Sequence, residues 1–243
     1  MQMEKDLLEV QVKHLKNVLQ ECDPKQLEKV EMDFALQYTT DAVGMCDKVI
    51  SVEDVERMSK AKALPDCSER QQKEILNHLR AFDEVKQAVL ESKTFTEDYM
   101  KDIHQRLVEG IFPGGIYRNV NISIFGAAHQ PPDHVKVYDR MSRFFNTLNE
   151  FKGSHLELST YAHASIAKIH PFVDANGRLA KLVLNHFLMS FGYLPISIPL
   201  DLMDEYIKHL ETFKVEKNLK PLTQFFKKLL LKRYDKVLEE LDI

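Results

Sequence analysis

The stretch KIHPFVDANGRLAKLVLN, residues 168–185, joins two apolar helical runs through a short polar segment. The segment contains a histidine, an aspartate, an Asn-Gly pair, an arginine and a lysine. His170 ends the first run and Gly177 opens the second. A plain connector between two helices does not need this set of residues. The stretch therefore predicts a helix–loop–helix unit that holds a ligand.

The start of the second helix suits an anion. A helix N-terminus has unpaired backbone N–H groups and the positive end of the macrodipole. Asn176 and Gly177 permit a tight turn, so these N–H groups can converge on one anion. Arg178 lies in the first turn, where a cation opposes the dipole unless an anion faces it, and Lys181 follows on the same face. These four residues predict a polyphosphate cradle.

Two further residues suggest a reaction. Asp174 would be out of place in a pure anion site, but it fits if Mg²⁺ lies between a carboxylate and phosphate oxygens. His170 titrates near neutrality and can accept a proton from an attacking hydroxyl. Base, metal carboxylate and phosphate cradle together indicate transfer from a nucleotide to an acceptor hydroxyl. The other interpretation is a capped loop with a buried histidine, which leaves Arg178 and Lys181 unexplained.

Composition narrows the class of protein. The 243 residues are 44% hydrophobic and 29% charged, as in ordinary globular proteins. The net charge of -4 and the pI near 6.2 argue against a nucleic-acid partner. The three cysteines form no disulfide or zinc pattern and indicate reduced thiols. We expect no membrane span and a cytoplasmic protein, with a secreted effector as the alternative.

Helical periodicity covers most of the chain, which has only eight glycines and nine prolines. Capping-box patterns predict helix starts at Ser51, Ser68 and Thr94. We also expect helices over about 156–169 and 177–191. The fold class predicted is all-α.

One segment breaks the helical pattern. In NVNISIF, residues 119–125, Val120, Ile122 and Ile124 alternate with polar residues, and glycines and prolines cluster around them. This pattern predicts a β-hairpin. As a flap, Ile122, Ser123, Ile124 and Phe125 could add a strand to a target protein and align its hydroxyl with His170. The other interpretation is an ordinary surface hairpin.

The whole string from His170 to Lys181 resembles the Fic-domain motif HPFx(D/E)GNGRxxR. GGIYR at 114–118, the hairpin segment and HQPP at 129–132 resemble the family's flap region. The resemblance covers most of residues 30–200. It implies a Fic-type helical bundle with one β-hairpin flap and transfer of AMP from ATP to a Ser, Thr or Tyr hydroxyl.

The resemblance also implies roles and domains. His170 would be the base, Asp174 the Mg²⁺ ligand, and Asn176, Gly177, Arg178 and Lys181 the nucleotide-phosphate site. Residues 1–60 would form an N-terminal helical lobe, 61–200 the Fic catalytic core, and 201–243 C-terminal helices packed on it. Partners would be a target protein with a hydroxyl, the chain itself included, or a second copy in a homodimer.

Two motif positions differ from the family. Ala175 replaces a glycine, so the loop must use a conformation that alanine tolerates. Lys181 replaces an arginine and lacks its planar fork. The Doc toxins, Fic relatives that phosphorylate, also have alanine at the first position but carry a lysine where this chain has Gly177. Gly177 therefore favours AMP transfer over phosphorylation.

A regulatory motif of the family also looks altered. Many Fic proteins carry an inhibitory helix with the pattern (S/T)xxxE(G/N), whose glutamate pairs with the second motif arginine. The best match here runs from Thr39 to Gly44, with Val43 at the glutamate position. A valine cannot bind a cation, so this resemblance predicts an enzyme that this helix does not inhibit. Two alternatives stay open: transfer of UMP, phosphocholine or phosphate, and a catalytically weak Fic-like binding module.

Overall fold

The computed structural model describes residues 2–44, 49–124 and 129–241. In these ranges the chain forms ten α-helices and two 3-10 helices, and no strand. The N-terminal half contains α1 (Gln2–Glu21), α2 (Pro24–Val43), α3 (Val52–Ser59), α4 (Glu69–Leu90) and α5 (Glu97–Leu107). The C-terminal half contains η1 (His134–Lys136), α6 (Val137–Glu150), α7 (His155–Ile169), α8 (Asn176–Ser190), η2 (Leu200–Leu202), α9 (Met203–Glu216) and α10 (Lys220–Glu240). The prediction of an all-α fold is confirmed.

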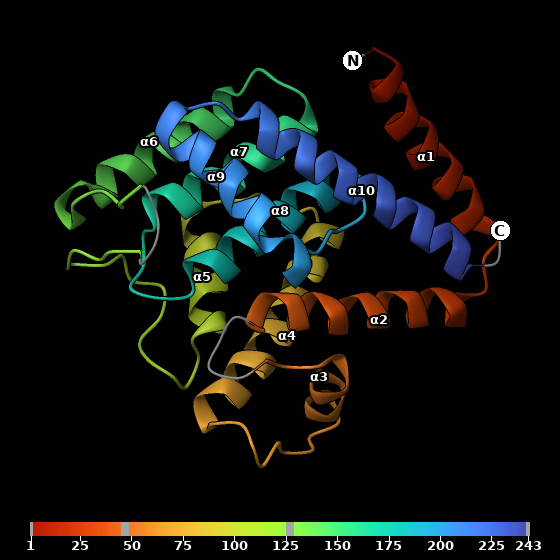
Figure 1. Cartoon of the computed structure of the whole chain (residues 1–243), viewed down its shortest axis with the longest axis horizontal. Helices are drawn as coiled ribbons and strands as arrows, with labels where there is room; N and C mark the ends of the chain where they lie inside the picture. The colour runs from red at the N-terminus through yellow and green to blue at the C-terminus, as the bar shows by residue number, and fades with distance from the viewer. Residues whose placement is uncertain (1, 45–48, 125–128, 242–243) are drawn as a thin grey trace.

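The helix pair α7 and α8 lies in the middle of the molecule, with α5, α6 and α9 around it (Figure 1). Both helices are buried along most of their length, because their apolar residues repeat on every face. They start and end within two residues of the predicted positions. The packed pair holds the intervening loop, residues 170–175, between two rigid elements.

The larger hydrophobic cluster contains residues from α1 to α10, and its centre is formed by α7 and α8. A smaller hydrophobic cluster joins the end of α2 to α3 and the start of α4, through Val43, Ile50, Val55 and Ile75. α1 also reaches α10, where Gln11 donates a hydrogen bond of 2.6 Å to Asp235. The division of the chain at residues 60 and 200 stays a prediction.

Two of the three predicted helix caps are confirmed. Ser51 forms a complete capping box with Asp54, and the Ser68 hydroxyl accepts from the Gln71 N–H. The expected cap at Thr94 is wrong, since Thr96 caps α5 by accepting from Tyr99 N–H. Both threonines stand before acidic residues, and Thr96 is the one followed at once by the helical run. In the described residues, no helix is long and apolar enough to span a bilayer.

The predicted β-hairpin is not supported by the described residues. Residues 119–124 and 129–133 follow irregular paths, while Phe125 and the expected turn lie outside the described residues. Side chains take the place of a strand ladder: the Gln130 amide donates to Ile124 O and accepts from Ile124 N–H. Val120 is 48% exposed, so the alternating apolar residues do not share one buried face, as the apolar residues of a core-packed strand would.

Candidate functional site

The loop between α7 and α8 begins and ends at left-handed residues. His170 caps α7 with φ 52°, and Ala175 precedes α8 with φ 58°. The alanine therefore adopts the positive φ that a glycine would take without strain. Ala175 has no side-chain acceptor, so the first N–H groups of α8 are not capped by it. These N–H groups face the space that an anion would need.

The side chain of Asn176 forms hydrogen bonds with the backbone inside the loop. Its side-chain oxygen accepts from Phe172 N–H at 2.9 Å, and its amide donates to Phe172 O at 2.8 Å. The residue is 1% exposed, and Phe172 is fully buried. The side chain of Asn176 is thus committed to the loop, and only its backbone is free to meet a phosphate.

Gly177 lies exposed in the first turn of α8. A Cβ placed there would meet no atom within 4 Å. The glycine is therefore not required by packing within the protein. It leaves open space directly at the helix N-terminus, where a side chain would stand between the backbone N–H groups and a ligand.

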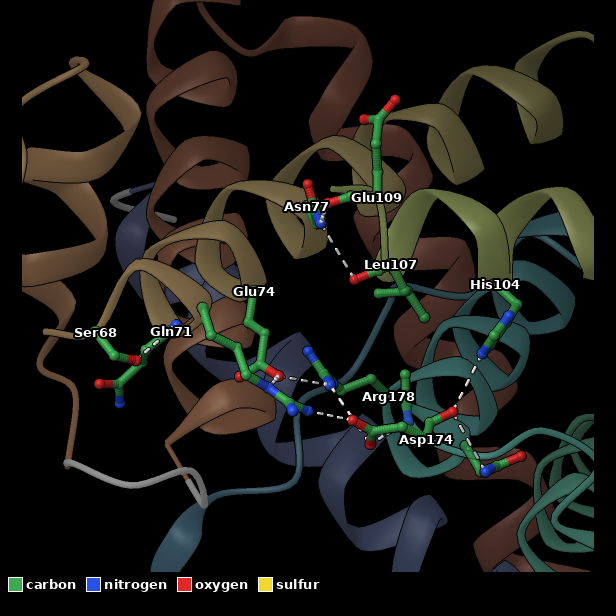
Figure 2. A network of polar contacts seen from close by, with 12 residues as sticks. Ser68, Gln71, Glu74, Asn77, His104, Leu107, Glu109, Asp174 and Arg178 are labelled. Carbon is green, nitrogen blue, oxygen red and sulfur yellow. Dashed lines mark hydrogen bonds and ion pairs between the residues drawn. The ribbon is translucent and has the colours of Figure 1, made fainter. Parts of the chain in front are cut away.

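Arg178 lies in a buried network of ion pairs (Figure 2). Its Nη2 lies 3.2 Å from Glu74 Oε1 and 3.9 Å from Asp174 Oδ1, and Glu74 is only 3% exposed. Arg70 pairs with both Glu74 and Asp174. Arg178 Nη1 is buried and finds no hydrogen-bond partner among the described residues. The guanidinium is thus held through Nη2, while the buried Nη1 can still donate a hydrogen bond to a ligand.

The sequence analysis missed Glu74 and Arg70, because both come from α4, about a hundred residues before the motif. It also missed His104 of α5, whose ring stacks on Phe172 at 3.7 Å between centroids. The His104 Nδ1 accepts from Gly115 N–H at 2.9 Å, so Nε2 carries the proton and donates to Asp174 O at 3.2 Å. His104 therefore fixes the backbone at Asp174.

Close packing on the other side of His104 depends on Gly114. A Cβ at this position would lie 2.5 Å from the Cα of Gln105 in α5. Only a glycine lets the 113–115 turn approach α5 so closely. This turn delivers the N–H that fixes the His104 tautomer.

His170 presents a defined face to the loop. Its Nδ1–H donates to Ala167 O at 3.3 Å, which leaves the lone pair on Nε2. The pKa of His170 is lowered to about 4, chiefly by burial and also by the charges of Lys214 and Arg118, while its bond to Ala167 and the charge of Asp174 act in the opposite direction. The imidazole is therefore neutral at physiological pH.

Arg118 ties three segments together beside His170. The residue is 2% exposed, and its guanidinium donates to His170 O at 2.8 Å, to Val120 O at 3.0 Å and to Pro132 O. Its backbone N–H donates to Pro171 O at 2.9 Å. The two ends of the 119–133 loop are therefore held against the end of α7 by one side chain.

The predicted flap residues lie in this loop. Ile122 and Ile124 are half-buried and Ser123 is exposed, while Phe125 lies outside the described residues. The loop returns to α7 at His129, whose Nε2–H donates to Lys168 O at 3.3 Å. The described flap residues thus belong to a loop whose two ends are bonded to Arg118, the same side chain that donates to His170 O.

The predicted inhibitory motif forms the end of α2. Thr39 is fully buried and shares a hydrogen bond of 2.9 Å with His78. Val43 packs in the smaller hydrophobic cluster, and Gly44 N–H donates to Thr40 O as the helix ends. The position that a glutamate would occupy is therefore apolar and inside the protein.

α2 nevertheless brings a carboxylate toward Lys181. Asp41 is 5% exposed, and its oxygens accept from Ser197 and from Gln37. Burial raises the pKa of Asp41, while the hydrogen bonds and the charge of Lys181 act in the opposite direction. Lys181 is itself 8% exposed. The sequence analysis missed Asp41, because it considered only position 43.

The chain is similar to known proteins in sequence and in fold. Residues 94–188 match the sequence model of the Fic/DOC family. The "Protein adenylyltransferase Fic" of Drosophila virilis is 31% identical over 157 residues, which are 63% of this chain and 32% of that protein. The Drosophila persimilis protein of the same name is 30% identical over 157 residues, or 30% of its length. The chain thus spans about a third of the length of these relatives.

Solved structures share the fold. A Fic-domain-containing signalling protein from Bacteroides thetaiotaomicron VPI-5482 superposes with a TM-score of 0.85 at 18% identity, over 96% of this chain and 97% of that one. Residues 134–508 of Fic-1 from C. elegans give a TM-score of 0.85 at 18% identity, over 99% of this chain and 73% of that one. Motif, fold and sequence similarity agree: residues 94–188 of the chain form a domain of the Fic/DOC family.

Proposed function

We propose that this protein transfers AMP from ATP to a Ser, Thr or Tyr hydroxyl of a protein. The observation that carries the proposal is the pairing of two features on one loop. The uncapped start of α8 with the buried, half-partnered Arg178 suits a polyphosphate. The neutral imidazole of His170 with its lone pair on Nε2 suits a hydroxyl. The relatives named protein adenylyltransferase support the choice of AMP.

The phosphates would lie at the N-terminus of α8. The backbone N–H groups of Asn176, Gly177 and Arg178 would donate to phosphate oxygens, and Arg178 Nη1 would find there the partner that it lacks. Lys181 would attract the distal phosphate as a point charge. The open space at Gly177 is the space that a phosphate needs.

Asp174 would hold Mg²⁺. Within the described residues no three His, Cys, Asp or Glu side chains gather as a metal cage. Mg²⁺ at a nucleotide site needs fewer protein ligands, since one carboxylate and phosphate oxygens suffice. Asp174 fits this donor set, because its side chain is 37% exposed and lies beside the phosphate cradle. Bound there, the ion would neutralise phosphate charge.

The chain's own groups then account for the transfer. His170 Nε2 accepts the proton of the acceptor hydroxyl, and the oxygen attacks the α-phosphorus of ATP. The new bond joins this oxygen to the phosphorus, while the bond to the β-phosphate oxygen breaks and pyrophosphate leaves. Arg178 and the N–H groups of α8 hold the phosphates in place.

The 119–133 loop would position the acceptor. Pairing of the acceptor backbone with Ile122, Ser123, Ile124 and Phe125 remains our proposal for this segment. The backbone of Ile124 is bonded to the Gln130 side chain, so an added strand must displace this amide at that position.

We further infer that α2 does not block the donor through position 43. Val43 is fully buried among apolar side chains and carries no charge. The negative charge that α2 does bring toward Lys181 belongs to Asp41.

Intact-protein mass spectrometry tests the proposed function. The protein is incubated with Mg²⁺, a generic acceptor and, in separate reactions, ATP, UTP, CDP-choline or none. We expect the mass of one AMP on the acceptor or on the chain itself with ATP alone. Addition of UMP, phosphocholine or phosphate identifies the other donor class. ATP binding with no transfer to any acceptor identifies a binding module and contradicts the proposal.

A further inference from the structure

A groove of about 640 Å³ lies beside the C-terminal end of α7, bounded by α6, the end of α9 and the 129–132 segment. We call it the basic groove, because four cationic side chains line it around an apolar floor. The residues used below are Arg140, Arg143, Lys168, Lys217, Phe144 and Phe213. None of the residues from 174 to 181 lines it, so it is separate from the proposed phosphate site.

The positive charge of the groove is largely uncompensated. Among the described residues, no acidic side chain pairs with Arg140, Lys168 or Lys217. Arg143 pairs with Asp139, but both side chains are more than half exposed, so this pair is weak. In a chain whose net charge is -4, this is a local excess of positive charge.

Lys168 shows that these cations lie close together. Its Nζ donates to Lys214 O at 2.7 Å and lies 5.4 Å from the ring centroid of Phe213. Burial lowers the pKa of Lys168, and the charges of Lys217, Arg140 and Lys214 lower it further. The nearby Glu211 already pairs with Lys214 and accepts from His129 N–H. Glu211 is therefore already paired, and the cations of the basic groove can still pair with negatively charged groups of a ligand.

The floor of the groove is apolar. Phe144, Ile169 and Phe213 are at least nine-tenths buried and still line it, together with the half-buried Tyr161. A groove with an apolar floor and cations on its rim matches a peptide with an apolar side chain flanked by carboxylates.

The groove is lined by chain neighbours of His170, the residue at the proposed reaction centre. Lys168 and Ile169 directly precede His170 in the chain. His129 and Pro132, at the end of the loop that Arg118 ties to His170, also line the groove. A polypeptide whose hydroxyl reaches His170 would therefore pass over the groove within a few residues.

We propose that the basic groove binds an acidic segment of the acceptor protein, next to the hydroxyl that is modified. The proposal rests on the proposed transfer to protein hydroxyls and names the chemical class of acceptor. Carboxylates pair with Arg140, Arg143, Lys168 and Lys217, and an apolar side chain between them contacts Phe144 and Phe213. The groove thereby selects acceptors by the charge around their hydroxyl.

The test measures peptide binding without nucleotide. The acidic probe is a fluorescent peptide with one Phe and one Ser among Asp and Glu residues. The neutral probe is the same peptide with Asn in place of each Asp and Gln in place of each Glu. The groove variant is Arg140→Gln with Lys217→Gln, since both cations are exposed and unpaired. The control variant is Lys228→Gln with Lys232→Gln, which removes the same charge from exposed positions of α10 outside the groove.

We expect wild type and the control variant to bind the acidic peptide about tenfold more tightly than the neutral one, and the groove variant to lose this preference. The preference should shrink as salt is raised. Equal affinity of wild type for both peptides overturns the proposal, as does a groove variant that matches the control. If AMP or inorganic phosphate displaces the peptide at a concentration below the peptide's Kd, the occupant of the groove is a small phosphate compound. This result also overturns the proposal.

The assay also separates this proposal from the proposed function. If wild type prefers the acidic peptide but modifies no acceptor with any nucleotide, the transferase assignment fails and the peptide site stands. If a generic acceptor is modified with the same KM by the groove and control variants, and neither peptide is preferred, the groove proposal fails alone. ATP affinity should be equal in all three proteins, since no groove residue lies at the α8 N-terminus.

Discussion

His170 combines a strained backbone with a defined tautomer. A non-glycine residue at φ 52° costs about 1 kcal/mol, and it persists because the packed helices on both sides hold it. The bond from Nδ1–H to Ala167 O keeps the Nε2 lone pair directed away from the helix end. Burial lowers the pKa of His170 to about 4, so the ring is neutral at physiological pH, the form that the proposed role as a base requires.

Replacement of His170 should remove transfer and leave donor binding. We expect His170→Asn to cut the transfer rate about a hundredfold or more, because no base remains to accept the hydroxyl proton. Asparagine tolerates positive φ better than alanine, so His170→Ala serves as a second variant with a more strained backbone. ATP binding by calorimetry should stay near wild type in both. Near wild-type transfer in His170→Asn would remove the histidine from the mechanism.

Asp174 can be tested through the metal dependence of ATP binding. We expect Asp174→Asn to weaken binding about tenfold with Mg²⁺ present and to change it little with EDTA, because only the metal-bound complex uses the carboxylate. Arg70→Gln is the matched control, since it removes the ion partner of Asp174 and keeps the carboxylate. An equal loss with Mg²⁺ and with EDTA would mean that the aspartate only holds the loop.

At the scale of the element, α2 brings the carboxylate of Asp41 near Lys181. This buried carboxylate lies close enough to Lys181 for the lysine charge to affect its pKa. A phosphate bound at Lys181 would meet the same negative charge. We therefore expect Asp41→Asn, which keeps the shape of the side chain, to raise ATP affinity about three- to tenfold.

The control for this experiment is Asp204→Asn, which removes an exposed carboxylate from α9. It should leave the ATP dissociation constant unchanged in calorimetry. If Asp41→Asn also leaves it unchanged, the carboxylate only joins α2 to Ser197 and Gln37. Val43→Glu is a less direct test, because a charge at this fully buried position also costs folding stability.

The elements around the motif show what a sequence can and cannot predict. Local patterns predicted the bounds of α7 and α8 to within one residue, since α8 starts at Asn176 and not at the expected Gly177. Glu74 and His104 gave no local signal, because each meets the motif only through folding, across 104 and 70 residues of chain. Arg118 stood in the GGIYR segment, but its contact with His170, 52 residues away, was not predicted. The hairpin prediction relied on alternation alone and missed the side-chain bonds of Gln130 that replace a ladder.

At the scale of the whole molecule, several histidines are buried in the neutral form. His163 is fully buried and shares a hydrogen bond of 3.0 Å with Tyr206. Burial lowers the pKa of His163 to about 3 and that of His186 to about 4. The unfolded chain binds protons at these side chains below about pH 6.5, while the folded chain does not. Folding stability from these groups is therefore present above pH 6.5 and is lost as the pH falls toward 4.

Urea denaturation at a series of pH values tests this dependence. Below about pH 6, His163 and His186 should each lower the free energy of unfolding by about 1.4 kcal/mol for every unit by which the pH falls. We expect His163→Gln to reduce the slope by about one proton, whatever its effect on stability at pH 7. His155→Gln, at an exposed position, should keep the wild-type slope. An unchanged slope in His163→Gln would show that this histidine takes up its proton before unfolding.

The guanidinium of Arg118 donates to Val120 O and Pro132 O, at the two ends of the 119–133 loop. It also donates to His170 O, so one side chain holds both ends of the loop beside His170. Exchange of residues 122–128 for an unrelated segment of equal length keeps the bonds of His129 to Lys168 O and Glu211, so it should leave the melting temperature within about 4 °C and change only the acceptors that are modified. A large loss of stability would show that the loop interior supports the fold. Because Arg118 and His129 hold the ends of the loop from outside the exchanged segment, descendants of this gene would, under the proposed function, gain new targets by changing that segment alone and inherit His170 and the start of α8 unaltered.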